Sequence, residues 1–134
     1  MKVDGQCHCG RIRYEAEIDP AAVMVCHCTD CQALSGSAFR TVALTVPDGF
    51  RLLSGSLTTY VKTAQSGARR RQTFCPNCGS PIYATSDAEG TKIYSLRLGT
   101  CRQRAELMPV AQIWCHSALP WLGDLPAGTR RAEE

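Results

Sequence analysis

The clearest hydrophobic pattern in the chain is a strict alternation over residues 11–18, where every second residue is apolar and those between are arginine or glutamate. The apolar positions are Ile12, Tyr14, Ala16 and Ile18. A period of two places alternate residues on one face, so the pattern predicts a half-buried β-strand. Pro20 has no backbone N–H to contribute to a sheet and is expected to end this strand.

Further short segments rich in β-forming residues follow, separated by turn residues at fairly regular spacing. They cover residues 23–25, 38–46, 50–53, 57–61, 72–74, 81–84, 92–98 and 110–115. We expect the turn Pro47-Asp48-Gly49 to end the segment before it, and Ser54-Gly55-Ser56 to join the segments on either side as a hairpin. Residues 65–71 and 86–91 are polar and are expected to be loops.

One short segment has a helical pattern. Thr29-Asp30-Cys31-Gln32 fits a capping box, in which the side chain of Thr29 would cap the first turn. Gly36 suits the position just after the helix, where a left-handed backbone is common. The fold class predicted is therefore mainly β, a small fold of short antiparallel strands with one short helix.

Length and composition indicate a single domain over residues 1–128, followed by a polar tail at 129–134. A formal charge of +3, with no basic stripe and no base-stacking aromatics, gives no support for a nucleic-acid partner. No apolar run is long enough for a signal peptide or a membrane span. We expect a cytoplasmic protein without a membrane partner, and the sequence leaves its oligomeric state open.

Cysteine spacing carries the chemical information. Seven of nine cysteines form three clusters: Cys7-x-Cys9, Cys26-x-Cys28-x-x-Cys31 and Cys75-x-x-Cys78. In a reducing compartment such spacing favours metal ligation over disulfides, and we favour zinc over an iron–sulfur cluster. Two closed four-cysteine sites would need eight thiolates, so seven predict two zinc ions in different environments.

The first predicted zinc site uses the two outer pairs, Cys7, Cys9, Cys75 and Cys78. A glycine follows each pair and allows the tight turn that brings two sulfurs to one ion. Four thiolates close a zinc site, so this one is expected to be structural. Its metal would join distant parts of the chain and add folding free energy directly.

The second predicted site has three cysteines, Cys26, Cys28 and Cys31. Cys31 falls in the first helical turn, where free N–H groups favour a thiolate. A three-ligand zinc keeps a position for another ligand, and an incoming thiol suits a sulfur-rich ion. The alternative is closure by an eighth ligand: His27, His116, Cys101, Cys115 or water.

Other chemical side chains have simpler interpretations. Cys101 and Cys115 belong to no cluster and are expected to be small buried residues. His8 and His116 are expected on the surface, and His27 near the second site but not bound to its metal. Five arginines, Arg69, Arg70, Arg71, Arg102 and Arg104, either form a solvated surface or hold the carboxylates of a glutathione-like ligand.

Several motifs together resemble the glutathione-dependent formaldehyde-activating enzyme family, which is shared with centromere protein V. They are Cys26-His27-Cys28-x-x-Cys31, Ser35-Gly36-Ser37-Ala38-Phe39, Arg71-x-x-Phe74-Cys75-Pro76-x-Cys78-Gly79-Ser80-Pro81, Leu98-Gly99-Thr100, Pro109, Ile113-Trp114 and Pro120-Trp121. The resemblance covers about residues 4–122. It implies a zinc fold of coiled sheets, with the first four cysteines on a structural zinc and Cys26, Cys28 and Cys31 on a catalytic one.

The family's named activity joins glutathione and formaldehyde into S-hydroxymethylglutathione, formally a carbon–sulfur lyase reaction. The resemblance therefore implies an enzyme acting on glutathione, or another thiol, and a small carbonyl compound. This chain departs from the family where Cys101-Arg102 follows Gly-Thr, a place where an apolar and an acidic residue are common. Two alternatives are a non-catalytic, zinc-stabilised binding module and a redox protein that uses Cys101 and Cys115.

Overall fold

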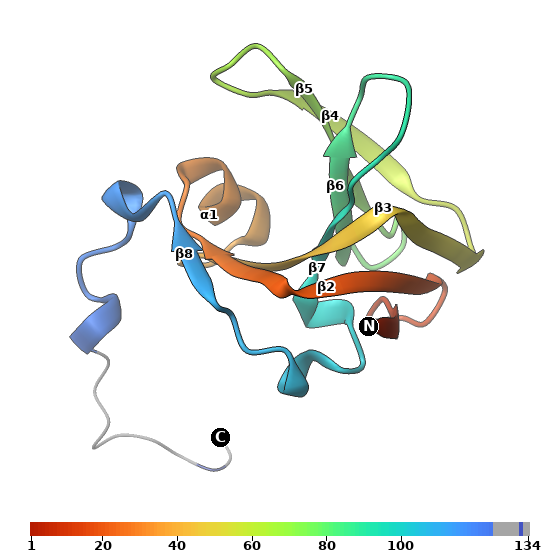
Figure 1. Cartoon of the computed structure of the whole chain (residues 1–134), viewed down its shortest axis with the longest axis horizontal. Coiled ribbons are helices and arrows are strands. Elements are labelled where there is room, and N and C mark those ends of the chain that lie inside the picture. The colour runs from red at the N-terminus through yellow and green to blue at the C-terminus, as the bar shows by residue number, and fades with distance from the viewer. Residues whose placement is uncertain (125–131, 133–134) are drawn as a thin grey trace.

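A computed structural model describes residues 1–124 and 132, in which eight strands and one α-helix are present (Figure 1). The strands are β1 (Lys2–Gln6), β2 (Arg13–Cys26), β3 (Arg40–Ser54), β4 (Thr58–Thr63), β5 (Arg69–Phe74), β6 (Pro81–Ser86), β7 (Ser95–Arg97) and β8 (Ala111–Ile113), and the helix is α1 (Thr29–Ser35). Short 3-10 turns follow at Leu98–Thr100, Arg104–Glu106, Cys115–Ser117 and Leu122–Asp124. The predicted mainly β fold with one short helix is confirmed, and most of the predicted tail at 129–134 lies outside the described residues.

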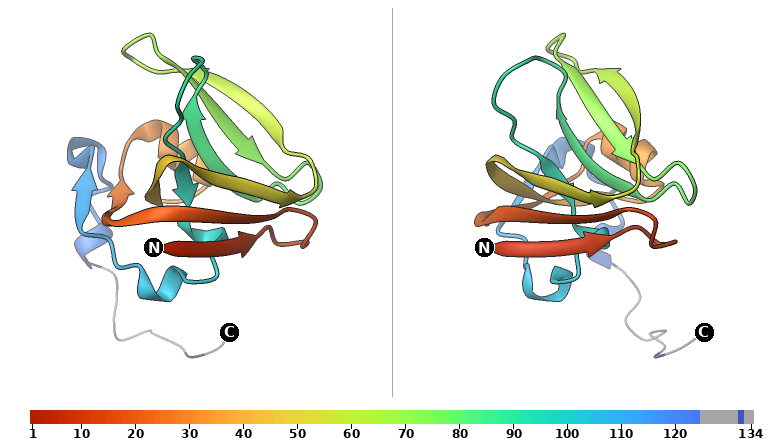
Figure 2. Two further views of the ribbon diagram at one scale, coloured as in Figure 1. Left: turned by 45° about the vertical axis from the view of Figure 1, so that its right-hand side comes forward. Right: turned by 90° about the vertical axis from the view of Figure 1, so that its right-hand side faces the viewer.

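The strands form one sheet in the order β1-β2-β3-β7-β6-β5-β4, with antiparallel neighbours throughout. β8 lies off this path and pairs in parallel with the end of β2. The sheet is strongly coiled, so β1, β2 and β3 cross beneath the steeply inclined β4, β5 and β6 (Figure 2). No helix in the described part of the chain has the length and apolar character needed to span a bilayer.

The alternation over residues 11–18 is confirmed, since its apolar side chains are buried and its charged ones exposed. The predicted end of the strand at Pro20 is wrong, because β2 continues to Cys26. The chain accommodates the proline with an irregularity: Ile18 lies opposite Thr45, and the next pair is Val23 with Ala43. Four β2 residues thus lie against one β3 residue, so three extra β2 residues bulge out where the proline cannot donate a hydrogen bond.

The predicted turn at residues 47–49 is likewise a bulge within a continuous β3. Ala16 lies opposite Phe50 and Ile18 opposite Thr45, so β3 carries extra residues between them, including Asp48 at φ 54°. The predicted hairpin across residues 54–56 is wrong, because β3 pairs with β2 and β7 while β4 pairs with β5. The actual partner of β4 is β5, which begins at Arg69, inside the stretch 65–71 that was expected to be a loop.

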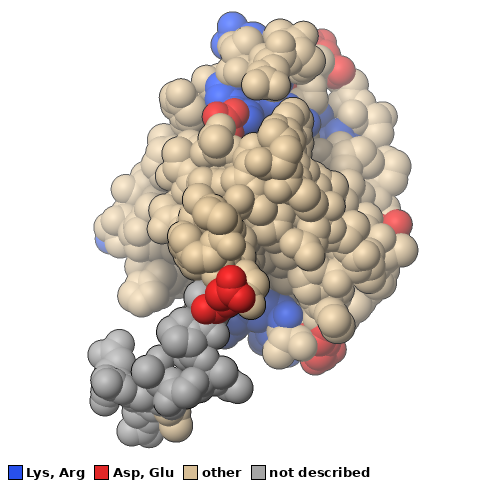
Figure 3. All heavy atoms as spheres, turned by 90° about the vertical axis from the view of Figure 1, so that its left-hand side faces the viewer, with Lys and Arg blue, Asp and Glu red and all other residues tan. Residues whose placement is uncertain are grey.

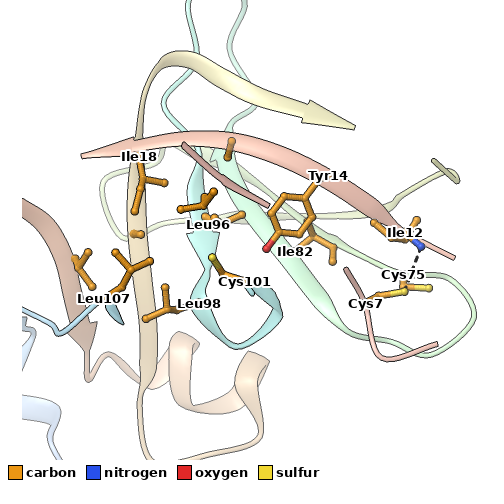
Figure 4. Packing of buried hydrophobic residues seen from close by; sticks show 14 residues of the cluster. Cys7, Ile12, Tyr14, Ile18, Cys75, Ile82, Leu96, Leu98, Cys101 and Leu107 are labelled. Atoms are coloured by element: carbon orange, nitrogen blue, oxygen red, sulfur yellow. Dashed lines mark hydrogen bonds between the residues drawn. The ribbon is translucent and has the colours of Figure 1, made fainter. Parts of the chain in front are cut away.

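The core lies between the coiled halves of the sheet and extends into the cysteine-bearing turns (Figure 4). Tyr14, Ile82 and Leu96 are fully buried, and the Tyr14 hydroxyl is 2.9 Å from the hydroxyl of Thr100. Cys101 is also buried, as expected, so it fills the core like a small apolar residue. The same expectation is wrong for Cys115, which is exposed in the 3-10 turn Cys115–Ser117.

Candidate metal centres

The structure brings the four cysteines of the first predicted site together. Their sulfur atoms all lie within 4.8 Å of one another, although two of them come from the turn between β1 and β2 and two from the turn between β5 and β6. The Cys7 and Cys9 sulfurs are 3.6 Å apart, and those of Cys9 and Cys75 are 3.8 Å apart. Sulfurs placed tetrahedrally around zinc at about 2.3 Å are about 3.8 Å apart, so the donor set fits zinc.

Backbone hydrogen bonds shape these two turns. Gly10 and Gly79 have φ angles of 80° and 77°, a region that disfavours any residue with a Cβ. The Gly79 N–H donates to the Cys75 carbonyl at 2.9 Å, and the Gly10 N–H to the Cys7 carbonyl at 3.1 Å. Each glycine therefore closes a tight loop around its cysteine pair, as expected from the sequence.

Hydrogen-bond donors around the first cluster favour the thiolate form of its outer sulfurs. A hydrogen bond from Ser80 lowers the pKa of Cys78 to about 5, and one from Asn77 lowers the pKa of Cys9. Burial raises the pKa of Cys7, although the Ile12 N–H donates to its sulfur at 3.2 Å (Figure 4). The cluster is thus buried on the core side and polar on the outer side.

The three cysteines of the second predicted site also come together, with sulfurs within 4.8 Å of one another. Cys26 ends β2, Cys28 precedes α1, and Cys31 lies in its first turn. The predicted cap at Thr29 is wrong: Cys28 is the N-cap, and its sulfur accepts the Cys31 N–H at 3.2 Å. Gly36 ends the helix at φ 64°, as expected.

The expected capping-box partner, Gln32, binds elsewhere. Its side-chain amide donates to the carbonyls of His27 and Ser117, both at 2.9 Å. It thereby ties the start of α1 to the 3-10 turn after β8. The Cys28 sulfur takes the capping position instead, since it accepts the Cys31 N–H.

The electrostatics differ from the sequence expectation for Cys31. Burial first, and then its cysteine neighbours, raise the pKa of the Cys31 thiol to about 12. Burial alone would raise the pKa of Cys28 as well, but hydrogen bonds, foremost that from the Cys31 N–H, outweigh it and lower that pKa. The helix start therefore favours the thiolate of Cys28, because the free N–H points at that sulfur and not at its own.

No further histidine, cysteine, aspartate or glutamate within residues 1–124 joins this cluster. His27 is 4% exposed, and its Nε2 lies 2.7 Å from the side-chain oxygen of Gln112, while its buried Nδ1 has no hydrogen-bond partner among the described residues. His116 and Cys115 are exposed in the 3-10 turn after β8, and Cys101 is in the core. Figure 3, viewed from the side that carries β8, shows charged atoms mainly toward the margins of this face.

Three of the five arginines singled out from the sequence form surface ion pairs. Arg71 and Arg69 pair with Asp87 at 2.7 Å and 3.4 Å, and Arg102 pairs with Asp4 at 2.6 Å. Arg70 is only half-buried, and burial lowers its pKa. The interpretation as a solvated surface thus holds for Arg69, Arg71 and Arg102.

Sequence reasoning missed two buried arginines near the second cluster, Arg40 and Arg97. Arg40 lies directly opposite Cys26 in the β2–β3 ladder. Burial lowers the pKa of Arg97 to about 9 and also lowers that of Arg40. A signal was present in the sequence, because Arg97 interrupts the apolar run Leu96-Arg97-Leu98 inside a predicted strand. A charged residue in a strand buried on both faces needs an explanation.

The fold and the two cysteine clusters define a small β protein with two candidate metal sites. Residues 2–117 match the model of a family described as glutathione-dependent formaldehyde-activating enzyme, and the chain belongs to that family. A crystal structure of a Rhodobacter sphaeroides protein is similar in fold, with a TM-score of 0.62 at 21% identity, covering 84% of this chain and 99% of that one. The family places this chain among proteins with a glutathione-related, formaldehyde-activating role.

Proposed function

We propose that this protein is a zinc enzyme of the carbon–sulfur lyase type that joins glutathione, or another thiol, to a small carbonyl compound such as formaldehyde. In this proposal Cys7, Cys9, Cys75 and Cys78 hold a structural zinc, and Cys26, Cys28 and Cys31 hold the catalytic one. The observation that carries it is the difference between the clusters: one supplies four sulfurs and the other three. Zinc takes four ligands in both kinds of site, and catalytic sites use three from the protein.

The second cluster suits a thiol as the further ligand. Bound there, zinc would supply a positive charge that stabilises the thiolate of glutathione and polarises a carbonyl oxygen. The three cysteines would fix the place of the reacting sulfur, and the Cys31 N–H would hold the charge on Cys28 through their hydrogen bond. The glutathione sulfur would attack the carbonyl carbon, and the carbonyl oxygen would take the proton lost by the thiol.

X-ray absorption at the zinc edge tests this proposal on protein loaded with two zinc ions per chain. Without thiol, four sulfurs at one site and three at the other average about 3.5 sulfurs per zinc. Millimolar glutathione should raise the average to about 4. An unchanged average would refute the thiol-binding site and favour a non-catalytic, zinc-stabilised binding module.

A matched pair of variants connects ligation to catalysis. Cys28→Ser should lower the rate of S-hydroxymethylglutathione formation, followed by NMR, to the spontaneous rate, while the first zinc is retained. Cys115→Ser is the control, since Cys115 is exposed and belongs to neither cluster. Equal rates for the two variants would show that the second cluster is not catalytic.

A further inference from the structure

The buried arginines share one face of the sheet with the second cluster. Cys26 and Arg40 are direct partners in the β2–β3 ladder, and directly opposite residues point to the same side. Arg97 is the direct partner of Val42, which lies two residues beyond Arg40 and therefore on the same face. The two guanidinium groups thus extend from the face that also presents Cys26.

The same face continues across the next strands. Arg97 donates to the side-chain oxygen of Gln72 at 2.5 Å, and Arg70 lies two residues from Gln72 on β5. Lys62 on β4 is opposite Arg70 and forms an ion pair with Asp30 at 2.7 Å. Because Asp30 is on α1, this ion pair holds the helix start, with Cys28 and Cys31, against the sheet face that carries the arginines. In Figure 1, α1 lies between β8 and β6.

Both arginines are buried beyond what their own contacts explain. Arg40 is 5% exposed and Arg97 is 7% exposed. Within residues 1–124, Nε and Nη2 of Arg40 and Nε of Arg97 are buried and have no hydrogen-bond partner. A charged donor that is removed from water without a partner costs several kcal/mol, so such groups normally face an anion.

Among the described residues, the anionic groups that act on these two arginines are the thiolates of the second cluster, and no carboxylate pairs with either arginine. The five ion pairs in this part of the chain involve other cations, and the nearby Asp30 is already taken by Lys62. Zinc with three cysteine thiolates and one incoming thiolate carries two negative charges. The face carries three guanidinium groups, those of Arg40, Arg70 and Arg97, so one positive charge remains for a further anion.

We propose that Arg40 and Arg97 bind the carboxylate of a substrate whose reacting group lies at the second cluster. A planar guanidinium fork matches a carboxylate and donates two parallel hydrogen bonds to it. This inference rests on the proposed function, because it is the thiol or the carbonyl compound that brings the carboxylate. The carboxylate belongs either to a peptide thiol such as glutathione or to an aldehyde acid such as glyoxylate, and the two sources can be separated.

Calorimetric titration of the zinc-loaded protein at low chloride distinguishes these sources. S-methylglutathione carries the carboxylates of the thiol but has no free sulfur to bind zinc, and glyoxylate carries the carboxylate of a carbonyl compound. The dimethyl ester of S-methylglutathione and the methyl ester of glyoxylate lack these carboxylate charges. We expect one carboxylate probe to bind at least tenfold more tightly than its ester, which identifies the source.

Variants of the arginines then test the site itself. Arg97→Met and Arg40→Met keep much of the apolar stem and should each raise the Kd of that probe at least tenfold, with Arg97→Lys intermediate because it keeps the charge and loses the fork. Arg51→Met is the control, since that arginine is exposed and pairs with Glu15. Circular dichroism and two bound zinc ions per chain establish that each variant is folded.

The outcomes separate this inference from the proposed function. An equal Kd for acid and ester, or an unchanged Kd in both methionine variants, would overturn the carboxylate site. Variants that lose zinc affinity but keep the Kd of the probe would show that the arginines only balance the charge of the cysteine thiolates. Weaker binding of S-methylglutathione in the variants supports the site even if glutathione adds no sulfur to zinc, since this probe does not depend on thiol ligation. If a methionine variant fails to fold, Arg97→Lys and the comparison of acid with ester still decide the matter.

Discussion

The backbone N–H of Cys31 donates a hydrogen bond to the sulfur of Cys28 at 3.2 Å. One contact therefore serves the fold and the candidate chemistry together. It satisfies a free N–H at the start of α1, and it places a partial positive charge beside a sulfur that would bind metal. The helix start and the second cluster are thus expected to respond together to substitution at residue 28.

Replacing the capping sulfur should destabilise the protein in a way that serine partly restores. Cys28→Ala and Cys28→Ser remove the same thiolate, but a serine hydroxyl can accept the Cys31 N–H. We expect Cys28→Ala to be less stable than Cys28→Ser by about 1 kcal/mol in urea unfolding at fixed zinc. Thr29→Ala should change stability little, and a larger loss there would instead support the cap at Thr29 that the sequence predicts.

The two cysteine clusters should differ in their effect on stability. Cys7 and Cys75 belong to the core and join the β1–β2 turn to the β5–β6 turn, whereas the second cluster lies within one local segment. Loss of a structural metal is among the largest single-substitution effects, above about 4 kcal/mol. We expect Cys75→Ser to lower the Tm by roughly 10 °C or more, and Cys31→Ser by much less.

Calorimetry and zinc analysis by mass spectrometry check this difference. Cys31→Ser should retain about one zinc per chain, since the first cluster keeps all four ligands. Cys101→Ala is a useful comparison, because it alters a buried thiol outside both clusters. Equal Tm losses for Cys75→Ser and Cys31→Ser would contradict the division into a stabilising and a reactive site.

Much of the fold could be predicted because period-two burial acts within a single strand. The burial of alternate residues around Tyr14 follows from the local sequence alone, and so does the helix end at Gly36. Pairing could not be predicted, because the choice of β5 as the partner of β4 depends on the coiling of the whole sheet. The residues at Pro20 and Asp48 were expected to end strands, but ladder pairs on both sides keep the chain extended.

The candidate site divides in the same way. Cysteine spacing predicted both clusters. Short spacings bring the sulfurs together within each pair and within the triplet, whereas joining the two distant pairs followed from the four ligands that a closed zinc site needs. Arg40 and Arg97 were missed because their relation to Cys26 exists only through strand register. Cys31 was expected to gain most from the helix start, but the direction of its N–H toward Cys28 reverses the order of the two thiols.

A polar contact between distant segments should show a defined pH dependence. Arg102 and Gln103 donate hydrogen bonds to Asp4 and lower its pKa to about 2. Since that pKa is below the ordinary value of 3.8, the contact stabilises the folded state fully above pH 3.8 and is lost only as the pH falls toward 2. The small stability difference between the wild type and Asp4→Asn should therefore stay constant from pH 8 to pH 4 in denaturant titrations. A difference that vanishes by pH 5 would show that the carboxylate is not held this way, and Asp19→Asn, at an exposed position, is the control.

The reactivity of the second cluster offers the most direct test of its electrostatics. Mild chelation that leaves one zinc per chain should expose its thiols while the first cluster stays loaded. At pH 8 iodoacetamide should then alkylate Cys28 before Cys31, because the pKa of Cys28 is lowered and that of Cys31 is raised to about 12, and only thiolates react. Peptide mapping by mass spectrometry gives both rates, and their ratio should fall to near one in denaturant, where both thiols return to ordinary values. Faster alkylation of Cys31 in the folded protein would mean that its N–H does not stabilise the thiolate of Cys28.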